Sequence, residues 1–94
     1  AILDNGFLGM VRQWQKLFYN RRYSQSELFN PDFIKLAEAY GAEGIRVSRP
    51  AELAPAIEQA ISSSKPVMLD FIVDREENVL PMVPPGGALN KMLG

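Results

Sequence analysis

A turn near the start of the chain carries the residues best suited to chemistry. Asp4 and Asn5 offer oxygen donors, and Gly6 completes a strong turn signal ahead of a predicted helix. Magnesium prefers oxygen ligands and often shares its coordination shell with phosphates. The free N–H groups and positive dipole at the start of a helix also favour anions. The pattern therefore predicts a site for a divalent ion and a diphosphate, although Asp4 or Asn5 could instead only cap the helix, the commoner role of such residues.

The composition excludes several other kinds of chemistry. The chain has no Cys and no His, which excludes disulfide scaffolds, thiolate chemistry, the usual zinc sites and a Ser-His-Asp triad. Its 10 Lys plus Arg and 11 Asp plus Glu give a net charge of −1, which argues against nucleic-acid binding. No apolar stretch approaches the roughly 20 residues needed to cross a membrane. Carboxylates, amides, backbone groups or a bound cofactor must therefore carry any reaction.

We expect the chain to be a piece of a longer protein. It starts with the apolar triplet Ala1, Ile2 and Leu3, which is typical of the end of a strand, and not with Met or a signal peptide. Its hydrophobic content of 47% and charged content of 22% are typical of a globular domain. Because 94 residues are close to the limit for a single core, we expect apolar surface that a neighbouring part would cover.

The residues after the turn are predicted to form a helix over residues 7–18, because apolar side chains recur there at spacings of three and four. The apolar face carries Phe7, Met10, Val11, Trp14, Leu17 and Phe18, and the polar face carries Arg12, Gln13, Gln15 and Lys16. Since such a stripe is usually core, Met10, Val11 and Trp14 could be plain core residues.

Two further helices are predicted. Asn30 and Pro31 fit the cap and first position of one helix, and Gly41 fits a left-handed residue at its end. Ser48 is the predicted cap of the next helix, which closes near residue 62. Pro55 should kink that helix, because an interior proline removes one hydrogen bond.

The order of the elements predicts one domain, residues 1–94, of the α/β class. Strands are expected at residues 1–3, 44–47 and 66–73, an irregular loop at 20–30, and a Pro/Gly-rich tail at 79–94. Alternating strands and helices imply a three-layer parallel sheet with helices on both faces. The carboxyl ends of its strands then share one edge, where ligands bind in such sheets.

Other charged residues fit structural roles better than chemistry. Arg21 and Arg22 are expected to be a solvated loop pair, and the acidic cluster at residues 74–77 a charged turn. Asp70 lies within a predicted strand, where a neighbouring N–H or a sheet edge is expected to satisfy it.

Residues 2–15 resemble the closing half of the thiamine diphosphate motif in the catalytic subunits of acetolactate synthases (acetohydroxyacid synthases). The run from Gly9 to Trp14 is the part most particular to acetolactate synthases within the thiamine enzymes. Further matches keep the order and spacing of the family at residues 18–19, 30–33, 35–37, 46–47, 79–82 and 85–87. The resemblance covers essentially the whole chain.

The resemblance implies how the cofactor and its metal are held. Asn5 would bind Mg²⁺ through its amide oxygen, Phe7 through its backbone carbonyl, and Gly9 and Met10 would contact thiamine diphosphate. The family usually has Asn where this chain has Asp4. Because that residue is not expected to be a direct ligand, the ion site should survive with altered charge nearby.

The resemblance also implies a substrate channel. The residues expected to line it are Met10, Val11, Trp14, Pro85 and Gly86. Trp14 corresponds to the family's determinant of 2-ketobutyrate over pyruvate as second substrate, and to a herbicide-contact position. Pro85 and Gly86 lie in the tail, residues 79–94, which is expected to cover the active site.

The activity that the resemblance implies is transfer of a two-carbon unit from pyruvate to a second 2-keto acid, in isoleucine and valine biosynthesis. It further implies FAD in the intact enzyme, a homodimer or higher oligomer, a regulatory small subunit, and a cytoplasmic location in bacteria or an organellar one in eukaryotes. No catalytic residue is expected here, and the chain alone should be inactive, because the Gly-Asp-Gly half of the motif and the activating glutamate are absent. A related thiamine enzyme of the glyoxylate carboligase or pyruvate oxidase type, or a non-catalytic folding or assembly module, remain alternatives.

Overall fold

The computed structural model describes residues 1–94, and the chain divides into two compact units. We call them the sheet unit, Ala1–Phe7 with Leu28–Arg75, and the helix–tail unit, Leu8–Glu27 with Glu76–Gly94. Each unit therefore joins two stretches that are far apart in the sequence. None of the helices is both long and apolar enough to cross a membrane.

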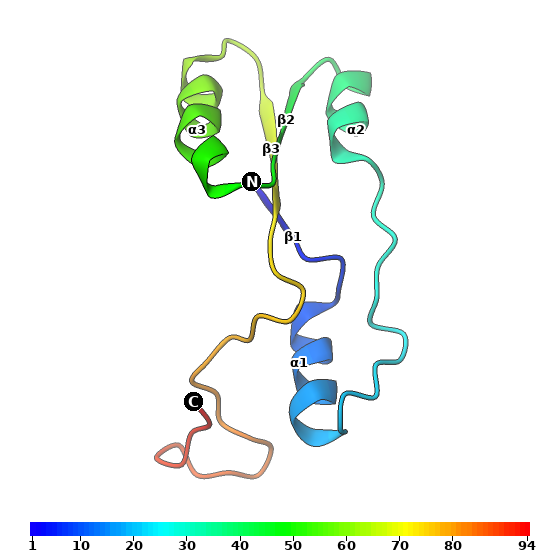
Figure 1. Ribbon diagram of the computed structural model, residues 1–94, viewed down its shortest axis with the longest axis vertical. Coiled ribbons are helices and arrows are strands. Elements are labelled where there is room, and N and C mark those ends of the chain that lie inside the picture. The colour runs from blue at the N-terminus through cyan, green and yellow to red at the C-terminus, as the bar shows by residue number, and fades with distance from the viewer. The chain divides into compact units, whose positions relative to one another are not determined.

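The sheet unit contains a parallel sheet of three strands in the order β1-β3-β2 (Figure 1). The strands are β1 (Ile2–Asp4), β2 (Glu43–Val47) and β3 (Val67–Ile72). The latest strand in the sequence is thus the central one, and its neighbours pair with it on either side. The parallel arrangement predicted from the alternation of elements is confirmed.

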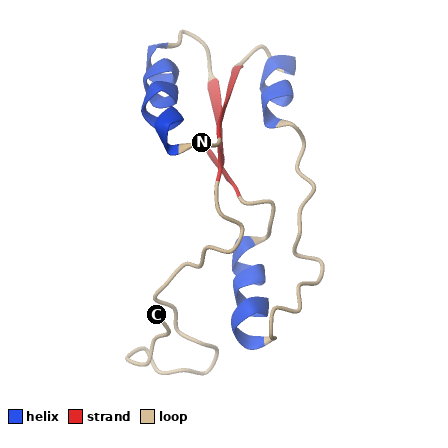
Figure 2. Ribbon diagram, viewed as in Figure 1, coloured by secondary structure: helices blue, strands red, loops and turns tan.

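Two helices cover the two faces of this sheet. The helices α2 (Phe33–Ala39) and α3 (Leu53–Ser62) both contact β2 and β3. They lie on opposite sides of these strands in Figures 1 and 2. Small apolar residues from each layer are buried where they meet: Ala37, Val47 and Ala56. The predicted three-layer α/β fold is therefore confirmed.

The start of α2 differs from the prediction. Its cap is Asp32 rather than Asn30, because the Asp32 carboxylate accepts hydrogen bonds from the N–H groups of the second and third helical residues, at 3.1 and 3.4 Å. These bonds, together with Arg46, hold the pKa of Asp32 below its ordinary value. Pro31 consequently precedes the helix. At the other end Gly41 has φ +75°, which confirms the predicted left-handed residue.

The kink predicted at Pro55 is wrong. A short 3₁₀ helix, Pro50–Glu52, precedes α3, which begins at Leu53. Pro55 therefore falls in the first turn of α3, where the backbone N–H has no helical partner to lose. Ser48 does not cap the helix; its own N–H donates to the Glu52 carboxylate at 2.9 Å.

Glu52 makes the stability of the sheet unit sensitive to acid. Hydrogen bonds from the Ser48 N–H and from Arg49 lower the pKa of Glu52 from 4.5 to about 2. A lowered pKa in the folded state stabilises the fold above about pH 4.5, and this stabilisation disappears as the pH falls towards 2. We expect Glu52→Gln to flatten the decline in melting temperature between pH 5 and 2. The same change at Glu58, an exposed glutamate of α3, should leave that decline as it is in the unmodified chain.

Asp70 occupies the central strand rather than a sheet edge, contrary to the prediction. It is 1% exposed and lies beside Arg46 of β2, whose Nε donates to Asp70 Oδ2 at 3.1 Å. The same guanidinium donates to Asp32 at 3.0 Å. These partners, Asp70 first, raise the pKa of Arg46. A cross-strand ion pair, and not a backbone N–H, therefore satisfies one oxygen of Asp70, while Oδ1 has no partner.

The helix–tail unit contains one helix, α1 (Gly9–Phe18). It begins two residues later than predicted, and its cap is Leu8, which makes no side-chain capping bond. The alternative in which Asp4 or Asn5 caps this helix is therefore wrong.

The burial of α1 is the reverse of what its sequence suggests. Arg12 and Gln13 from the polar face are 0% and 1% exposed, whereas Trp14 is 45% exposed and Met10 43%. Hence Trp14 and Met10 are not core residues of this chain. The expectation that the chain leaves apolar surface exposed agrees with these values.

Candidate functional site

The turn after β1 is fixed by its own side chains. Asp4 Oδ1 accepts a hydrogen bond from the Gly6 N–H, and Asn5 Oδ1 accepts one from the Phe7 N–H, both at 3.0 Å. Gly6 has φ +66°, a conformation that favours glycine. The guanidinium of Arg75 lies 4.7 Å from the centre of the Phe7 ring, within the range of a cation–π contact.

Neighbouring segments of the sheet unit hold the same turn in place. The Asn30 amide donates to Asp4 Oδ1 at 2.8 Å, and the Leu28 N–H donates to the Gly6 carbonyl at 2.8 Å. The Val73 N–H donates to the Asp4 carbonyl at 3.1 Å. Bonds from two other segments thus converge on the turn, and a site held in place in this way has a lower entropic cost of binding.

A hollow of about 190 Å³ adjoins the turn. Its lining consists of Asp4, Asn5, Gly6, Ile72, Val73 and Arg75. An amide oxygen has two lone pairs, so Asn5 Oδ1 retains one for a cation after bonding to the Phe7 N–H. The chain has no group of three or more His, Cys, Asp or Glu side chains able to hold a metal ion. The donors present therefore fit part of a magnesium shell, and its other oxygens must come from outside this chain.

A second, apolar hollow lies within the helix–tail unit. It has a volume of about 330 Å³ and is lined by Trp14, Phe18, Tyr19, Pro84 and Pro85. The structure thus brings together Trp14 and Pro85, both of which were predicted to line a channel. Phe18 follows Trp14 by four residues, and this helical spacing is a signal that could have added it.

The other predicted residues do not line this hollow. Gly9 opens α1, and Met10 projects from its exposed side. Val11 is half-buried. Gly86 has φ +74° in the turn that the Gly87 N–H closes on the Pro84 carbonyl at 2.9 Å.

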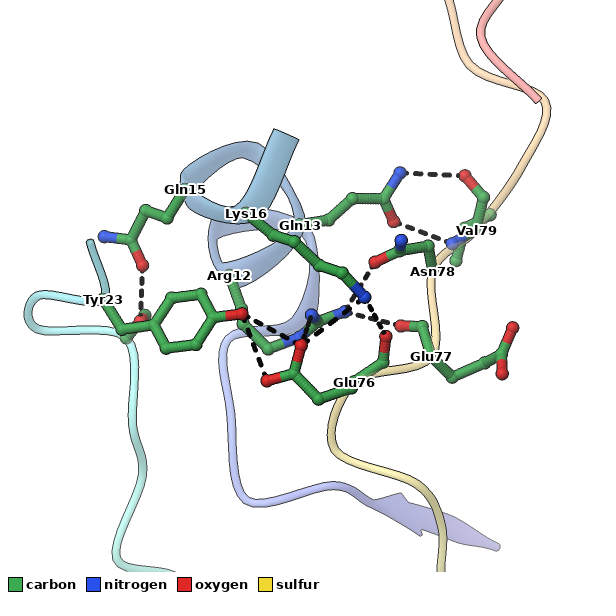
Figure 3. A network of polar contacts seen from close by, with 10 residues as sticks. Arg12, Gln13, Gln15, Lys16, Tyr23, Glu76, Glu77, Asn78 and Val79 are labelled. Carbon is green, nitrogen blue, oxygen red and sulfur yellow. Dashed lines mark hydrogen bonds and ion pairs between the residues drawn. The ribbon is translucent and has the colours of Figure 1, made fainter. Parts of the chain in front are cut away.

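A polar network between α1 and the segment after residue 75 was not predicted from the sequence (Figure 3). Glu76 accepts hydrogen bonds from the Tyr23 hydroxyl at 2.9 and 3.1 Å and pairs with Arg12 at 3.4 Å and Lys16 at 3.5 Å. The Tyr23 hydroxyl, and then the two cations, lower the pKa of Glu76. The acidic cluster therefore includes a residue that binds α1, whereas the loop pair Arg21 and Arg22 is exposed as expected.

Comparison with protein families matches residues 1–71 to the C-terminal TPP binding domain of thiamine pyrophosphate enzymes. The chain belongs to this family. Thiamine pyrophosphate (TPP) is thiamine diphosphate, so the resemblance seen in residues 2–15 is confirmed at this level.

Individual relatives of this chain are acetolactate synthases. It is 48% identical over 92 residues to the mitochondrial acetolactate synthase catalytic subunit of Saccharomyces cerevisiae, and this match covers 98% of the chain. It is 45% identical over 94 residues to the acetolactate synthase isozyme 2 large subunit of Escherichia coli, covering 99%, and 48% identical over 93 residues to the large subunit of Haemophilus influenzae, covering 97%. The chain spans only 13%, 17% and 16% of the lengths of these relatives, respectively.

Proposed function

We propose that this chain is part of the catalytic subunit of an acetolactate synthase, where it binds the metal and diphosphate end of the cofactor and lines the substrate channel. The observation that carries the proposal is the turn from Asp4 to Phe7, which presents an amide oxygen beside a hollow and directly precedes α1. A rigid Asx turn followed by a helix is well suited to a metal-bound diphosphate.

The proposed roles of the residues are binding and orientation. Thiamine diphosphate supplies the electron sink for decarboxylation and carbon–carbon bond formation. Asn5 Oδ1 and the Phe7 carbonyl would hold Mg²⁺, while Gly9 and Met10 would contact the cofactor at the uncapped start of α1. Asp4 would stabilise the turn rather than bind the ion: its Oδ1 accepts hydrogen bonds from the Gly6 N–H and the Asn30 amide.

The remaining predicted residues would form the channel. Trp14 and Pro85 border the same apolar hollow, which suits an aliphatic 2-keto acid side chain. Met10, Val11 and Gly86 would extend the wall, and residues 79–94 would cover it. The relatives cover 97 to 99% of the chain, well beyond residue 71 where the family match ends, which supports an acetolactate synthase over a more distant thiamine enzyme.

The wider setting of the enzyme follows from the same proposal. It would contain FAD, assemble as a homodimer or higher oligomer, and bind a regulatory small subunit. Its products would enter isoleucine and valine biosynthesis, in the cytoplasm of a bacterium or an organelle of a eukaryote.

The proposed reaction can be tested on the full-length protein that contains this chain. Incubation with pyruvate, thiamine diphosphate and Mg²⁺ should yield acetolactate, and addition of 2-ketobutyrate should yield the mixed product. Omission of Mg²⁺ should abolish both products. Condensation of glyoxylate, or oxidation of pyruvate without condensation, would instead identify a related thiamine enzyme.

The chain by itself is expected to bind no cofactor and to form no acetolactate, because it supplies only part of the magnesium shell. At about millimolar thiamine diphosphate and Mg²⁺, its melting temperature should not change, since stabilisation requires ligand well above its dissociation constant. The full-length protein under the same conditions is the positive control. A clear rise in the melting temperature of the chain alone would contradict this expectation.

A further inference from the structure

The side chains of α1 hold the start of the tail through contacts that the proposed function leaves without a role. Gln13 makes the central contact: its Nε2 donates to the Val79 carbonyl at 3.0 Å, and the Val79 N–H donates to Gln13 Oε1 at 2.7 Å (Figure 3). Gln13 Nε2 also lies 3.0 Å from the Met82 sulfur. One buried amide thus binds both backbone groups of one tail residue and the side chain of another.

Arg12 and Lys16 extend these contacts to the three residues just before the tail. Arg12 Nη2 donates to the Glu77 carbonyl at 2.5 Å and to Asn78 Oδ1 at 3.0 Å, and Lys16 Nζ donates to the Glu76 carbonyl at 3.0 Å. Together with Gln13, these side chains contact every residue from 76 to 79. We call this set of contacts the clasp.

The clasp holds the segment that leads into the tail. Residues 76–81 belong to no helix or strand, so no ladder of backbone hydrogen bonds fixes their register. Arg12 and Gln13 are buried. The Gln13 amide uses both its nitrogen and its oxygen in hydrogen bonds to Val79. A shift of Val79 would leave these buried polar atoms without partners, which is energetically costly.

The position of Val79 affects the apolar hollow, because Val79 and two residues that line the hollow belong to the same tail. Met82 pairs with Leu93 in an antiparallel bridge, which closes the tail into a loop that contains Pro84 and Pro85. Both prolines line the hollow together with Trp14, the residue that follows Gln13 in α1. Trp14 therefore lines the hollow, and the adjacent Gln13 holds the tail whose prolines line the same hollow.

We propose that Gln13 is a positioning residue, which places Pro84 and Pro85 against Trp14 and thereby tunes the choice of the second 2-keto acid. This inference rests on the proposed function. A tail released from Gln13 would widen the hollow, and discrimination between keto acids that differ by one methylene depends on such close apolar contact.

The test compares four forms of the full-length protein: unmodified, Gln13→Leu, Gln13→Glu and Gln15→Leu. Gln15 is the matched control, because it lies on the same helix and makes two hydrogen bonds, but to Ser24 and Ser26 rather than to the tail. The readouts are the product ratio in competition between pyruvate and 2-ketobutyrate, and amide hydrogen exchange in residues 79–86. The product ratio is insensitive to the fraction of folded enzyme, so a purely structural role would not move it.

We expect Gln13→Leu to speed exchange in residues 79–86 and to change the product ratio at least about threefold, with Gln15→Leu changing neither. Gln13→Glu keeps the acceptor for the Val79 N–H and loses the donor to its carbonyl, so it should give a smaller change in the same direction. If Gln13→Leu does not fold, the exchange and the product ratio of Gln13→Glu test the inference instead.

Two results from the variants would overturn the inference. Unchanged exchange in both Gln13 variants would show that Gln13 does not hold the tail. Faster exchange with a product ratio equal to that of Gln15→Leu would show that the clasp has no part in substrate choice. An unmodified protein that forms no acetolactate would refute the proposed function and the effect on substrate choice, while exchange would still report separately on the clasp.

Discussion

Replacing Asn5 by alanine is expected to weaken the binding of Mg²⁺ and thiamine diphosphate to the full-length enzyme at least about tenfold, or about 1.4 kcal/mol. The change removes an amide oxygen that has a lone pair available for the ion after its bond to the Phe7 N–H. Because the proposed site holds the diphosphate through the same ion, both affinities should fall together. Calorimetric titration of the cofactor at several Mg²⁺ concentrations would measure them.

Two other variants separate metal binding from support of the turn. Asn5→Asp keeps a hard oxygen ligand and should retain part of the affinity. Asn30→Ala is the matched control, because this amide contacts the same turn through its nitrogen, at Asp4, and leaves the Asn5 oxygen in place. If Asn5→Ala bound both ligands as tightly as the unmodified enzyme, Asn5 would be only a turn residue.

Replacing Trp14 by leucine is expected to change the preference between pyruvate and 2-ketobutyrate about tenfold while leaving the fold largely intact. The indole borders the apolar hollow, and one methylene in such a pocket is worth about 1–3 kcal/mol. Because Trp14 is 45% exposed, the loss of core packing should be small. Competition between the two keto acids in the full-length enzyme, with melting temperatures alongside, would measure both effects.

Phe29→Leu provides the control for loss of an aromatic ring. Phe29 is 96% exposed and does not border this hollow, so its replacement should alter neither the product ratio nor the stability. A large drop in the melting temperature of Trp14→Leu with an unchanged product ratio would contradict the assignment of Trp14 to the channel.

Local patterns were sufficient for the class of fold and for the turn. The alternation of elements predicted a parallel sheet between two helical layers, because parallel strands require crossover connections and those connections must cover the sheet. Gly41 and the Asp4–Gly6 turn were also predictable, since their chemistry involves only neighbouring residues.

Predictions failed where two local solutions compete. Asn30 and Asp32 can both cap a helix, and Asp32 is chosen because Asn30 donates to Asp4, a residue distant in the sequence. Pro55 does not interrupt α3, because the residues before the helix form a 3₁₀ helix and Pro55 therefore falls in the first turn of α3. Asp70 tolerates the central strand because Arg46 is its register partner, and no sequence pattern specifies the register between strands.

The sequence by itself determined that α1 is a helix with an apolar and a polar face, and that it follows the turn formed by Asp4, Asn5 and Gly6. Only the tertiary structure decided that Arg12 and Gln13 of the polar face are buried. The physical reason is that Glu76, Glu77 and Val79 belong to no helix or strand, and their backbone groups bond instead to the side chains of Lys16, Arg12 and Gln13. A helical pattern in the sequence shows which side chains share a face of the helix. Which face is covered depends on residues 76–79, which lie more than 60 residues from Arg12 and Gln13 in the chain.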